Sequence, residues 1–376
     1  MKLVLTPTDT FFFRNHKAMN AGADFFASGL FPPRPGTVYG ALRSAYIHAK
    51  SDFAAFAAGS DEELSKWMGT PSSYGKFAIK GVVLQDEQDM ALPLPLDHQV
   101  LLGISGSATA KRLRLKYEPE KEVFGSDRCP YRLYGVSEEK SASASGRFVY
   151  RQDFVKALLQ PVDLEVHSAS RWVISEQRVG IAMDRVAKKA QQSMFYSMEA
   201  LRFRDENGTA IAAICDSENT PDFSGVTLAS LGAKQRPWSL KVERNTDLGV
   251  TKEEIVGAIE KSGIARIILL TPALWKHGTR PECWDGERNA LLINGRLYPV
   301  LAAAIGRPLI EGGWDIVRNR PKPRFHAVPA GSVLYVKVAS GDADNLVASI
   351  HETNFTDSSA QEGYGFAVVG AGFLNQ

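Results

Sequence analysis

The opening fifty residues pass from a strand-like pattern of apolar positions to a helix-like one. Leu3 to Leu5 form a short apolar run, which is typical of a buried strand. Further on, apolar residues recur at helical spacing, and Thr37 is a residue type that caps helices. We therefore predict a strand followed by a helix that begins near Thr37, just after Pro35. The residues expected on its buried face are Val38, Ala41, Leu42, Ala45 and Ala49.

A polar, partly basic turn lies between this strand and helix. Phe11 to Phe13 precede it, and the turn itself reads Arg14, Asn15, His16 and Lys17. Loop amides and helix N-termini attract phosphate, so this arrangement suits contact with a nucleic-acid backbone. The alternative is an ordinary strand–helix unit with solvated charges, which is the commoner origin of such clusters.

The segment 51–165 shows weaker periodicity, and we predict it to be a large insertion. Its start, up to Ser73, has a helical and polar pattern, and its end is rich in Ser, Ala and Gly. Lys111 to Tyr117 is the densest basic stretch of the chain. Strand-like alternation would place Arg112, Arg114 and Lys116 on one side, either along a nucleic acid or on a charged edge strand. The pattern leaves both interpretations open.

Two strand-like runs follow, from Trp172 to Ile181 and from Met194 to Phe203. We predict that they pair as a β-hairpin, although the residues between them also fit an amphipathic helix. The loop Leu228–Trp238 comes next and contains Lys234 and Arg236.

The last third of the chain, beginning with the strand-like run Ala265–Leu270, predicts a β-α-β-β-α-β order. That order is typical of a ferredoxin-like, or RRM-like, domain. The remaining predicted elements are a helix over Leu297–Ile305, a strand pair from Trp314–Val317 and Val333–Val338, a helix over Asn345–Ile350 and a strand over Phe366–Val369.

Composition adds three constraints. A length of 376 residues favours two domains. The net charge of +2 means that a nucleic-acid site would need locally concentrated positive charge. Three widely spaced cysteines, Cys129, Cys215 and Cys283, predict neither a disulfide framework nor a zinc site and suit a reducing, cytoplasmic setting. We expect no membrane span, because no apolar stretch approaches the required length.

Motifs for cofactor, metal and hydrolase chemistry are missing from the sequence, and we predict no cofactor and no metal. Gly363, Gly365 and Gly370 do not have the spacing of a dinucleotide-binding loop. Glycines in such a loop can nevertheless let backbone amides approach a phosphate closely.

Several motifs together resemble one protein family. They are Phe12-Phe13-Arg14, Leu30-Phe31-Pro32-Pro33, Gly40-Ala41-Leu42-Arg43, Glu176-x-Arg178-x-Gly180 and Val328-Pro329-Ala330-Gly331-Ser332-Val333. They resemble the third subunit of the type III-B (Cmr) CRISPR effector complex, a member of the RAMP superfamily. Asn15-His16-Lys17 departs from the family's usual Asp-Gly-Arg, and Ala233 replaces a glycine of its Leu-Gly-Gly loop.

The resemblance implies an α+β protein with two ferredoxin-like domains, at about 1–250 with the insertion and at about 264–376. It implies a non-catalytic subunit that grips the 5′ tag of CRISPR RNA and joins the large polymerase-like subunit to the backbone subunits. The predicted RNA-binding residues are Arg14, Asn15, His16, Lys17, Arg43, Arg178, Lys234, Arg236, Gly363, Tyr364 and Gly365.

Two alternatives to this function stay open. One is a protein-interaction scaffold with little RNA contact, which the modest net charge favours. The other is a metal-independent RAMP endoribonuclease, for which His16 and His48 would be the candidate acid or base.

Overall fold

Strand β1, Lys2–Pro7, lies inside an eight-stranded sheet whose strand pairs are all antiparallel. The computed structural model describes residues 1–15, 26–27, 29–103, 107–118, 129–183, 189–204, 208–244, 248–315 and 320–374. In order across this first sheet, the strands are β12 (His167–Ser168), β10 (Arg147–Tyr150), β4 (Met90–Pro93), β3 (Gly81–Gln85), β15 (Ala210–Ile214), β1, β17 (Pro237–Glu243) and β16 (Leu228–Ser230).

A second antiparallel sheet is built from the last third of the chain. Its central strand β18, Ile264–Leu269, confirms the predicted strand at 265–270. The strand order is β19 (Trp284–Asp285), β20 (Ala290–Ile293), β21 (Arg296–Ala304), β26 (Val333–Lys337), β18, β28 (Phe366–Ala371) and β27 (Thr353–Asn354).

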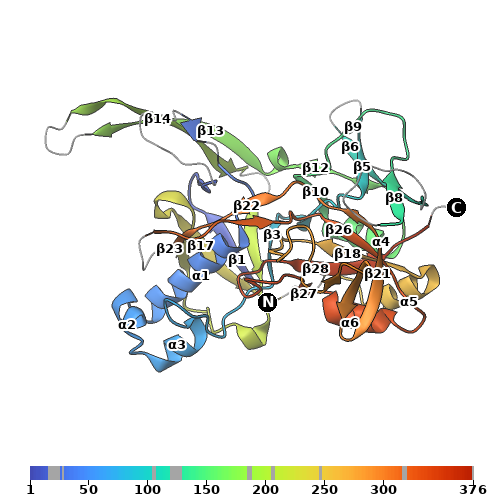
Figure 1. Ribbon diagram of the computed structural model, residues 1–376. Helices are drawn as coiled ribbons and strands as arrows, with labels where there is room; N and C mark the ends of the chain where they lie inside the picture. The colour runs from blue at the N-terminus through green and yellow to red at the C-terminus, as the bar shows by residue number, and fades with distance from the viewer. Residues whose placement is uncertain are drawn as a thin grey trace.

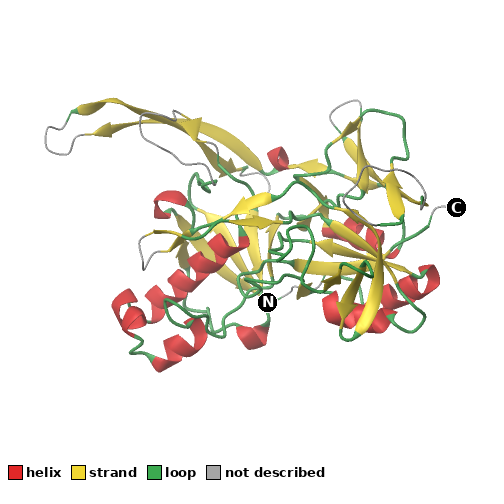
Figure 2. Cartoon of the chain, viewed as in Figure 1, coloured by secondary structure: helices red, strands yellow, loops and turns green. Residues whose placement is uncertain are grey.

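The two sheets pack face to face, with most of the helices on their outer sides. In β1, Leu3 and Leu5 join the core under the first helices, whereas Val4 joins a core shared by both sheets. In β18, Ile268 faces that shared core and Ile267 faces the core under α5 (Lys252–Ser262) and α6 (Ala343–Ile350). Alternate residues of a strand point to opposite faces, so both central strands are buried on both sides. Figure 2 shows the helices gathered beside the sheets.

Helix α1, Pro35–Lys50, buries Val38, Ala41, Leu42 and Ala45 as predicted, whereas Ala49 is exposed. The predicted cap at Thr37 is wrong, because the N-cap is Arg34 and Pro35 occupies the first turn. Proline suits that position, since its missing N–H would have no partner there. Helices α2 (Phe53–Ala58) and α3 (Glu62–Met68) follow and confirm the helical reading of the next segment.

Two predicted elements of the second unit are wrong. The expected helix at 297–305 is strand β21, which pairs with both β20 and β26. Pairing in the sheet overrides the helical preference of its three alanines, and Pro299 disfavours a helix interior. Strand β23, Trp314–Asp315, pairs with β24, Arg320–Pro321, rather than with the strand beginning at Val333.

The segment 51–165 contributes strands β3, β4 and β10 to the first sheet. Helix α4, Arg151–Leu159, then packs against β28 of the second sheet. The strands that pair apart from the main sheet are β5 (His98–Leu102), β6 (Ala108–Arg112), β9 (Ser141–Ala142) and β11 (Leu164–Glu165), and the hairpin of β7 (Arg114–Tyr117) with β8 (Tyr131–Tyr134).

The predicted hairpin after Arg171 is confirmed. Strand β13, Val173–Met183, pairs antiparallel with β14, Ala190–Phe203, and β14 also pairs with the short strand β2, Phe26–Ala27. In Figure 1 this hairpin extends away from the two sheets as a long arm. A final two-stranded ribbon pairs β22, Leu309–Glu311, with β25, Phe325–Ala327. In the parts of the chain described above, no helix is long and apolar enough to cross a membrane.

Candidate nucleic-acid interface

Three arginines from two separate parts of the chain converge on Asp9, at the end of β1. Arg202 Nη2 lies 3.0 Å from Asp9 Oδ1, and Arg236 Nη1 lies 3.1 Å from Asp9 Oδ2. Arg178 Nη2 lies 3.9 Å from Asp9 Oδ1 and 3.5 Å from Glu176 Oε2. Arg202 also binds Glu176 through Nε. We call these five residues the arginine cluster.

The register of the hairpin explains why part of the cluster forms. Arg178 stands opposite Met198, Glu176 opposite Ala200, and Arg202 opposite Ile174. Directly opposed residues and residues two apart share one face of an antiparallel pair, so Glu176, Arg178 and Arg202 project from the same face.

A tight loop before β17 brings in the remaining arginine. Gly232 has φ +86°, and an added Cβ would lie 2.8 Å from the carbonyl oxygen of Phe12. The Ala233 N–H donates to that same oxygen at 2.8 Å. Glycine is therefore required both by the left-handed backbone and by the close approach. The loop then presents Lys234 and Arg236 beside the start of the chain.

The cluster is accessible to solvent and carries a net positive charge. The side chains of Arg178, Arg202 and Arg236 are 38%, 35% and 32% exposed. A hydrogen bond from the Thr10 N–H, together with Arg178 and Arg202, lowers the pKa of Asp9. A hydrogen bond from Arg202 lowers the pKa of Glu176. With both carboxylates ionised, three arginines leave one net positive charge, and each guanidinium has further N–H donors for a ligand.

A hollow of about 340 Å³ adjoins the cluster. Its lining includes Asp9, Arg202 and Arg204 together with Thr8 and Thr209. Arg204 is exposed, and its Nε donates to the Ser170 carbonyl at 3.0 Å. Two arginines and several threonines thus line the hollow together with the Asp9 carboxylate, Pro7 and Phe203, and the arginines offer donors to an anionic group.

Only part of the predicted basic turn lies within the described residues. Arg14 is exposed and bridges Gly29 through its backbone, and Asn15 is half-buried. His16 and Lys17 lie outside the described residues. Phe11 bridges Leu201 of β14, which keeps the start of this turn beside the hairpin that carries Arg202.

Arg43 does not project from the molecule as a free cation. Its Nε donates to the Met68 carbonyl at 2.8 Å and its Nη2 to the Thr70 carbonyl at 2.7 Å. The guanidinium also lies 5.0 Å from the centroid of the Phe56 ring. Burial lowers the pKa of Arg43. The prediction that Arg43 neutralises RNA phosphate is corrected, because its donors tie α1 to the end of α3.

The predicted glycine-rich RNA loop is buried inside the protein. The Gly363 and Gly365 N–H groups donate to the Ala360 and Pro272 carbonyls. Both glycines have positive φ, and an added Cβ at Gly365 would lie 2.7 Å from the Phe355 carbonyl oxygen. Glycine therefore serves packing here, and these amides are not free to form an anion nest.

The prediction that Tyr364 stacks on an RNA base is also corrected. Its side chain is 4% exposed, and its hydroxyl donates to Glu311 Oε2 at 3.0 Å. A base would have to displace core side chains to reach this ring.

The basic stretch 111–117 is divided between two strands. Arg112 ends β6, and its guanidinium binds the carbonyls of Ala157 and Gln160. Arg114 and Lys116 belong to β7 and are exposed. The expectation of three cations on one side is wrong, because the break at Leu113 turns Arg112 toward the protein interior.

Sequence reasoning missed Asp9 and Arg202, which occupy the centre of the arginine cluster. Arg202 could be predicted once the register of the hairpin is known. In that register, positions 174, 176 and 178 share a face with positions 198, 200 and 202. No sequence pattern around Asp9 indicated its role, since its partner Arg236 is 227 positions away.

With this geometry described, comparisons with known proteins identify the family. The family model described as "CRISPR-associated protein (Cas_Cmr3)" matches residues 3–372. The chain belongs to this Cas_Cmr3 family. Membership confirms the resemblance drawn from the sequence motifs and makes the protein a type III CRISPR effector component.

One solved structure agrees at the level of the fold, and a second is reported beside it. A chain of Type III-B Cmr-beta bound to cognate target RNA and AMPPnP is 15% identical, with a TM-score of 0.50, and the match covers 89% of this chain and 86% of that chain. A chain of Type III-B Cmr-beta bound to cognate target RNA is 14% identical, with a TM-score of 0.49 and the same coverage. No curated protein matches the sequence.

Proposed function

We propose that this Cas_Cmr3 protein is a non-catalytic RNA-binding subunit that holds the 5′ tag of a guide RNA through the arginine cluster. The observation that carries the proposal is the convergence of Arg178, Arg202 and Arg236 at an exposed site beside a hollow whose lining includes Arg202 and Arg204. Guanidinium groups held in place by carboxylates present fixed donors to phosphate oxygens.

The position of the cluster suits a long ligand rather than a small one. It lies where the hairpin β13–β14 meets the body of the protein, and exposed Lys234 and Arg14 come from the two neighbouring loops. A strand of RNA would contact several of these cations at once, which makes its affinity depend strongly on salt.

The proposed place in the assembly is between the large polymerase-like subunit and the backbone subunits of a type III-B complex. Family membership supports this placement. We also propose that the two sheets derive from two ferredoxin-like units. The central strands follow the same order in both, β3-β15-β1-β17 and β21-β26-β18-β28, although each unit has a helix in only one of its two crossovers.

Of the two candidate histidines for catalysis, His48 lies within the described residues and is exposed. Its ring centroid lies 4.8 Å from that of Phe53, at the end of α1, which is a packing contact. If the protein cleaves precursor CRISPR RNA, and His48→Ala or His16→Ala abolishes that cleavage, the non-catalytic assignment is wrong.

The arginine cluster is tested by the double variant R178A/R202A. We expect the full chain to bind a labelled single-stranded RNA about tenfold more weakly, with a salt slope smaller by about 1.4, because two phosphate contacts are lost. The measurement is fluorescence anisotropy over a range of KCl concentrations, and photocrosslinking in the assembled complex then locates the contact along the guide.

The matched control is K252A/K261A, which removes two exposed charges from α5. Equal RNA binding by R178A/R202A and this control would reject the arginine cluster as an RNA site. A complex that still assembles with R178A/R202A and holds its guide RNA normally would favour the scaffold alternative.

A further inference from the structure

The segment 320–326 forms a continuous basic surface outside the arginine cluster. It reads Arg-Pro-Lys-Pro-Arg-Phe-His, and all seven residues are exposed. Arg320, Lys322, Arg324 and His326 alternate with uncharged residues. Strand β24 and the start of β25 form its two ends, and residues 322–324 connect them.

The ribbon β22–β25, to which this segment leads, is fixed firmly to the body of the protein. Ala327 is buried in a small core with Leu274 and Tyr364. Glu311, on the partner strand β22, forms an ion pair with Arg34 at 2.8 Å and accepts the Tyr364 hydroxyl. One side of the ribbon is therefore anchored by packing and a buried charge pair, and the exposed cations are attached to a rigid support.

The positive charge of this surface is largely uncompensated. Among the side chains that the structure describes, Arg324 and Arg307, which precedes β22, form no ion pair. Lys322 has one acidic neighbour, with its Nζ 3.9 Å from Glu362 Oε1, and half of the Lys322 side chain remains exposed. A partner with regularly spaced negative charge would complement this surface.

A nucleic-acid strand suits the surface better than an acidic protein does. Lys322, Arg324 and His326 recur at every second residue of the segment, so its basic side chains follow one another closely along the chain. Phe325 lies between Arg324 and His326 in the chain and is 54% exposed, which leaves an aromatic surface available for a base. Cations along a backbone path with an accessible aromatic ring are the usual components of single-strand binding sites.

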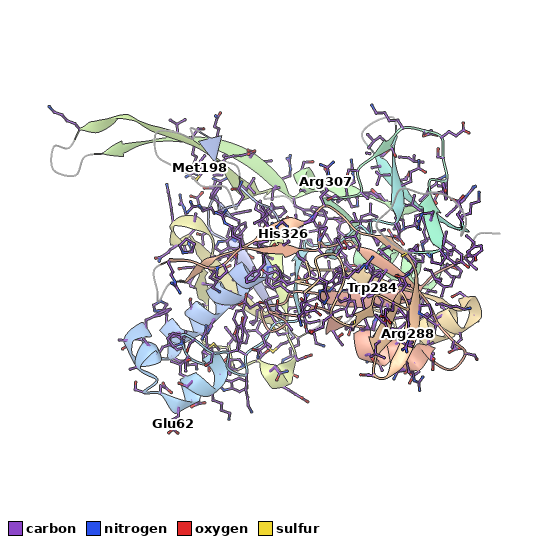
Figure 3. The ribbon with its side chains drawn as sticks, in the orientation of Figure 1. Glu62, Met198, Trp284, Arg288, Arg307 and His326 are labelled. Atoms are coloured by element: carbon purple, nitrogen blue, oxygen red, sulfur yellow. The ribbon has the colours of Figure 1, made fainter. Side chains whose placement is uncertain are left out.

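In Figure 3, Arg307 and His326 lie on the side of the molecule from which the hairpin extends, whereas Glu62 and Arg288 lie at the opposite edge. The ion pair between Arg34 and Glu311 joins the ribbon to the proline-rich bend, which follows the predicted basic turn in the chain.

We propose that the segment 320–326, with Arg307, binds the backbone of single-stranded RNA as a second contact that is separate from the arginine cluster. This inference rests on the proposed function, since it extends the path of the same RNA across the protein. Lys322 and Arg324 supply phosphate contacts, and Phe325 stacks on a base.

The test uses the full chain and a fluorescein-labelled single-stranded RNA. The variant K322A/R324A removes two exposed charges, and K252A/K261A again serves as the matched control. We expect the salt slope of K322A/R324A to fall by about 1.4, the value for two single-strand phosphate contacts, while the control keeps the wild-type slope. A photoreactive phenylalanine analogue at Phe325 should crosslink to the RNA, whereas the same analogue at Leu292, which is 51% exposed, should not.

The outcomes separate this inference from the proposed function. A wild-type slope for K322A/R324A with no crosslink at position 325, while R178A/R202A binds weakly, would overturn the second contact alone. Normal binding by R178A/R202A with reduced binding by K322A/R324A would retain the second contact and reject the arginine cluster. Normal RNA binding by K322A/R324A with loss of assembly would show a protein-binding surface instead, which also overturns the inference.

Discussion

At the scale of single residues, Asp9 has two opposing effects on the arginine cluster. Its carboxylate accepts from Arg202 and Arg236 and holds their guanidinium groups near each other. The same carboxylate repels phosphate and occupies N–H donors that a phosphate would use. Because Asp9 is 39% exposed, an incoming phosphate can reach the donors around it.

The variant Asp9→Asn measures the balance of these effects. The amide oxygen still accepts a hydrogen bond, while the negative charge is removed. We expect RNA to bind about threefold more tightly at low salt, since the local net charge rises by one and a charge effect of this kind is strongest at low ionic strength. Anisotropy at two KCl concentrations provides the measurement, and weaker binding would instead show that the charge of Asp9 is needed to orient the arginines.

At the scale of secondary-structure elements, Arg43 shows how a basic side chain can be structural. It connects α1 to the turn after α3 by two hydrogen bonds to carbonyls and by its contact with Phe56. Removing it would leave two carbonyls without that donor in a partly buried setting.

The variant Arg43→Ala should therefore affect stability rather than RNA binding. We expect a loss of about 2 kcal/mol in the free energy of unfolding, the usual cost of unpaired buried acceptors. Urea denaturation measures this loss, and the salt slope of RNA binding should equal that of the wild type. A reduced slope in folded protein would restore Arg43 to the RNA-binding residues.

At the scale of the whole molecule, a buried ion pair joins the segment before β5, in the small four-stranded sheet, to the second main sheet. Asp97 precedes β5, and Arg266 belongs to β18. The Arg266 Nε and Nη2 atoms lie 2.8 and 3.0 Å from the two Asp97 oxygens, and the Tyr335 hydroxyl donates to Asp97 at 2.7 Å. Both charged side chains are fully buried. Burial alone would raise the pKa of Asp97, but Arg266 and His98 lower it well below its usual value.

The variant Asp97→Asn should destabilise the protein by about 3–5 kcal/mol, because it leaves the Arg266 charge buried without a counter-ion. The double variant D97N/R266M should be less destabilised than D97N alone, since both charges are removed. Urea denaturation of the two variants measures the difference. Because the pKa of Asp97 is lowered in the folded state, the stability from the pair is present above pH 3.8 and is lost only as the pH falls further. A double variant that is less stable than D97N would contradict this account.

Local patterns in the sequence determined a large part of the fold. The apolar runs of β1 and β18, the capping box of Thr251 and Glu254 at α5, and the alternating strands of the hairpin each depend on neighbours a few positions away. The motifs that identify the family are also short segments.

The tertiary structure decided which polar residues meet and which glycines are buried. Arg178 and Arg236 were predicted separately, but only folding brings them to Asp9 across the hairpin and the loop before β17. Gly363, Tyr364 and Gly365 resembled an exposed loop until packing against Phe355 and Glu311 placed them in the core. The physical reason is that burial and ion pairing depend on contacts between distant segments, which periodicity along the chain does not record.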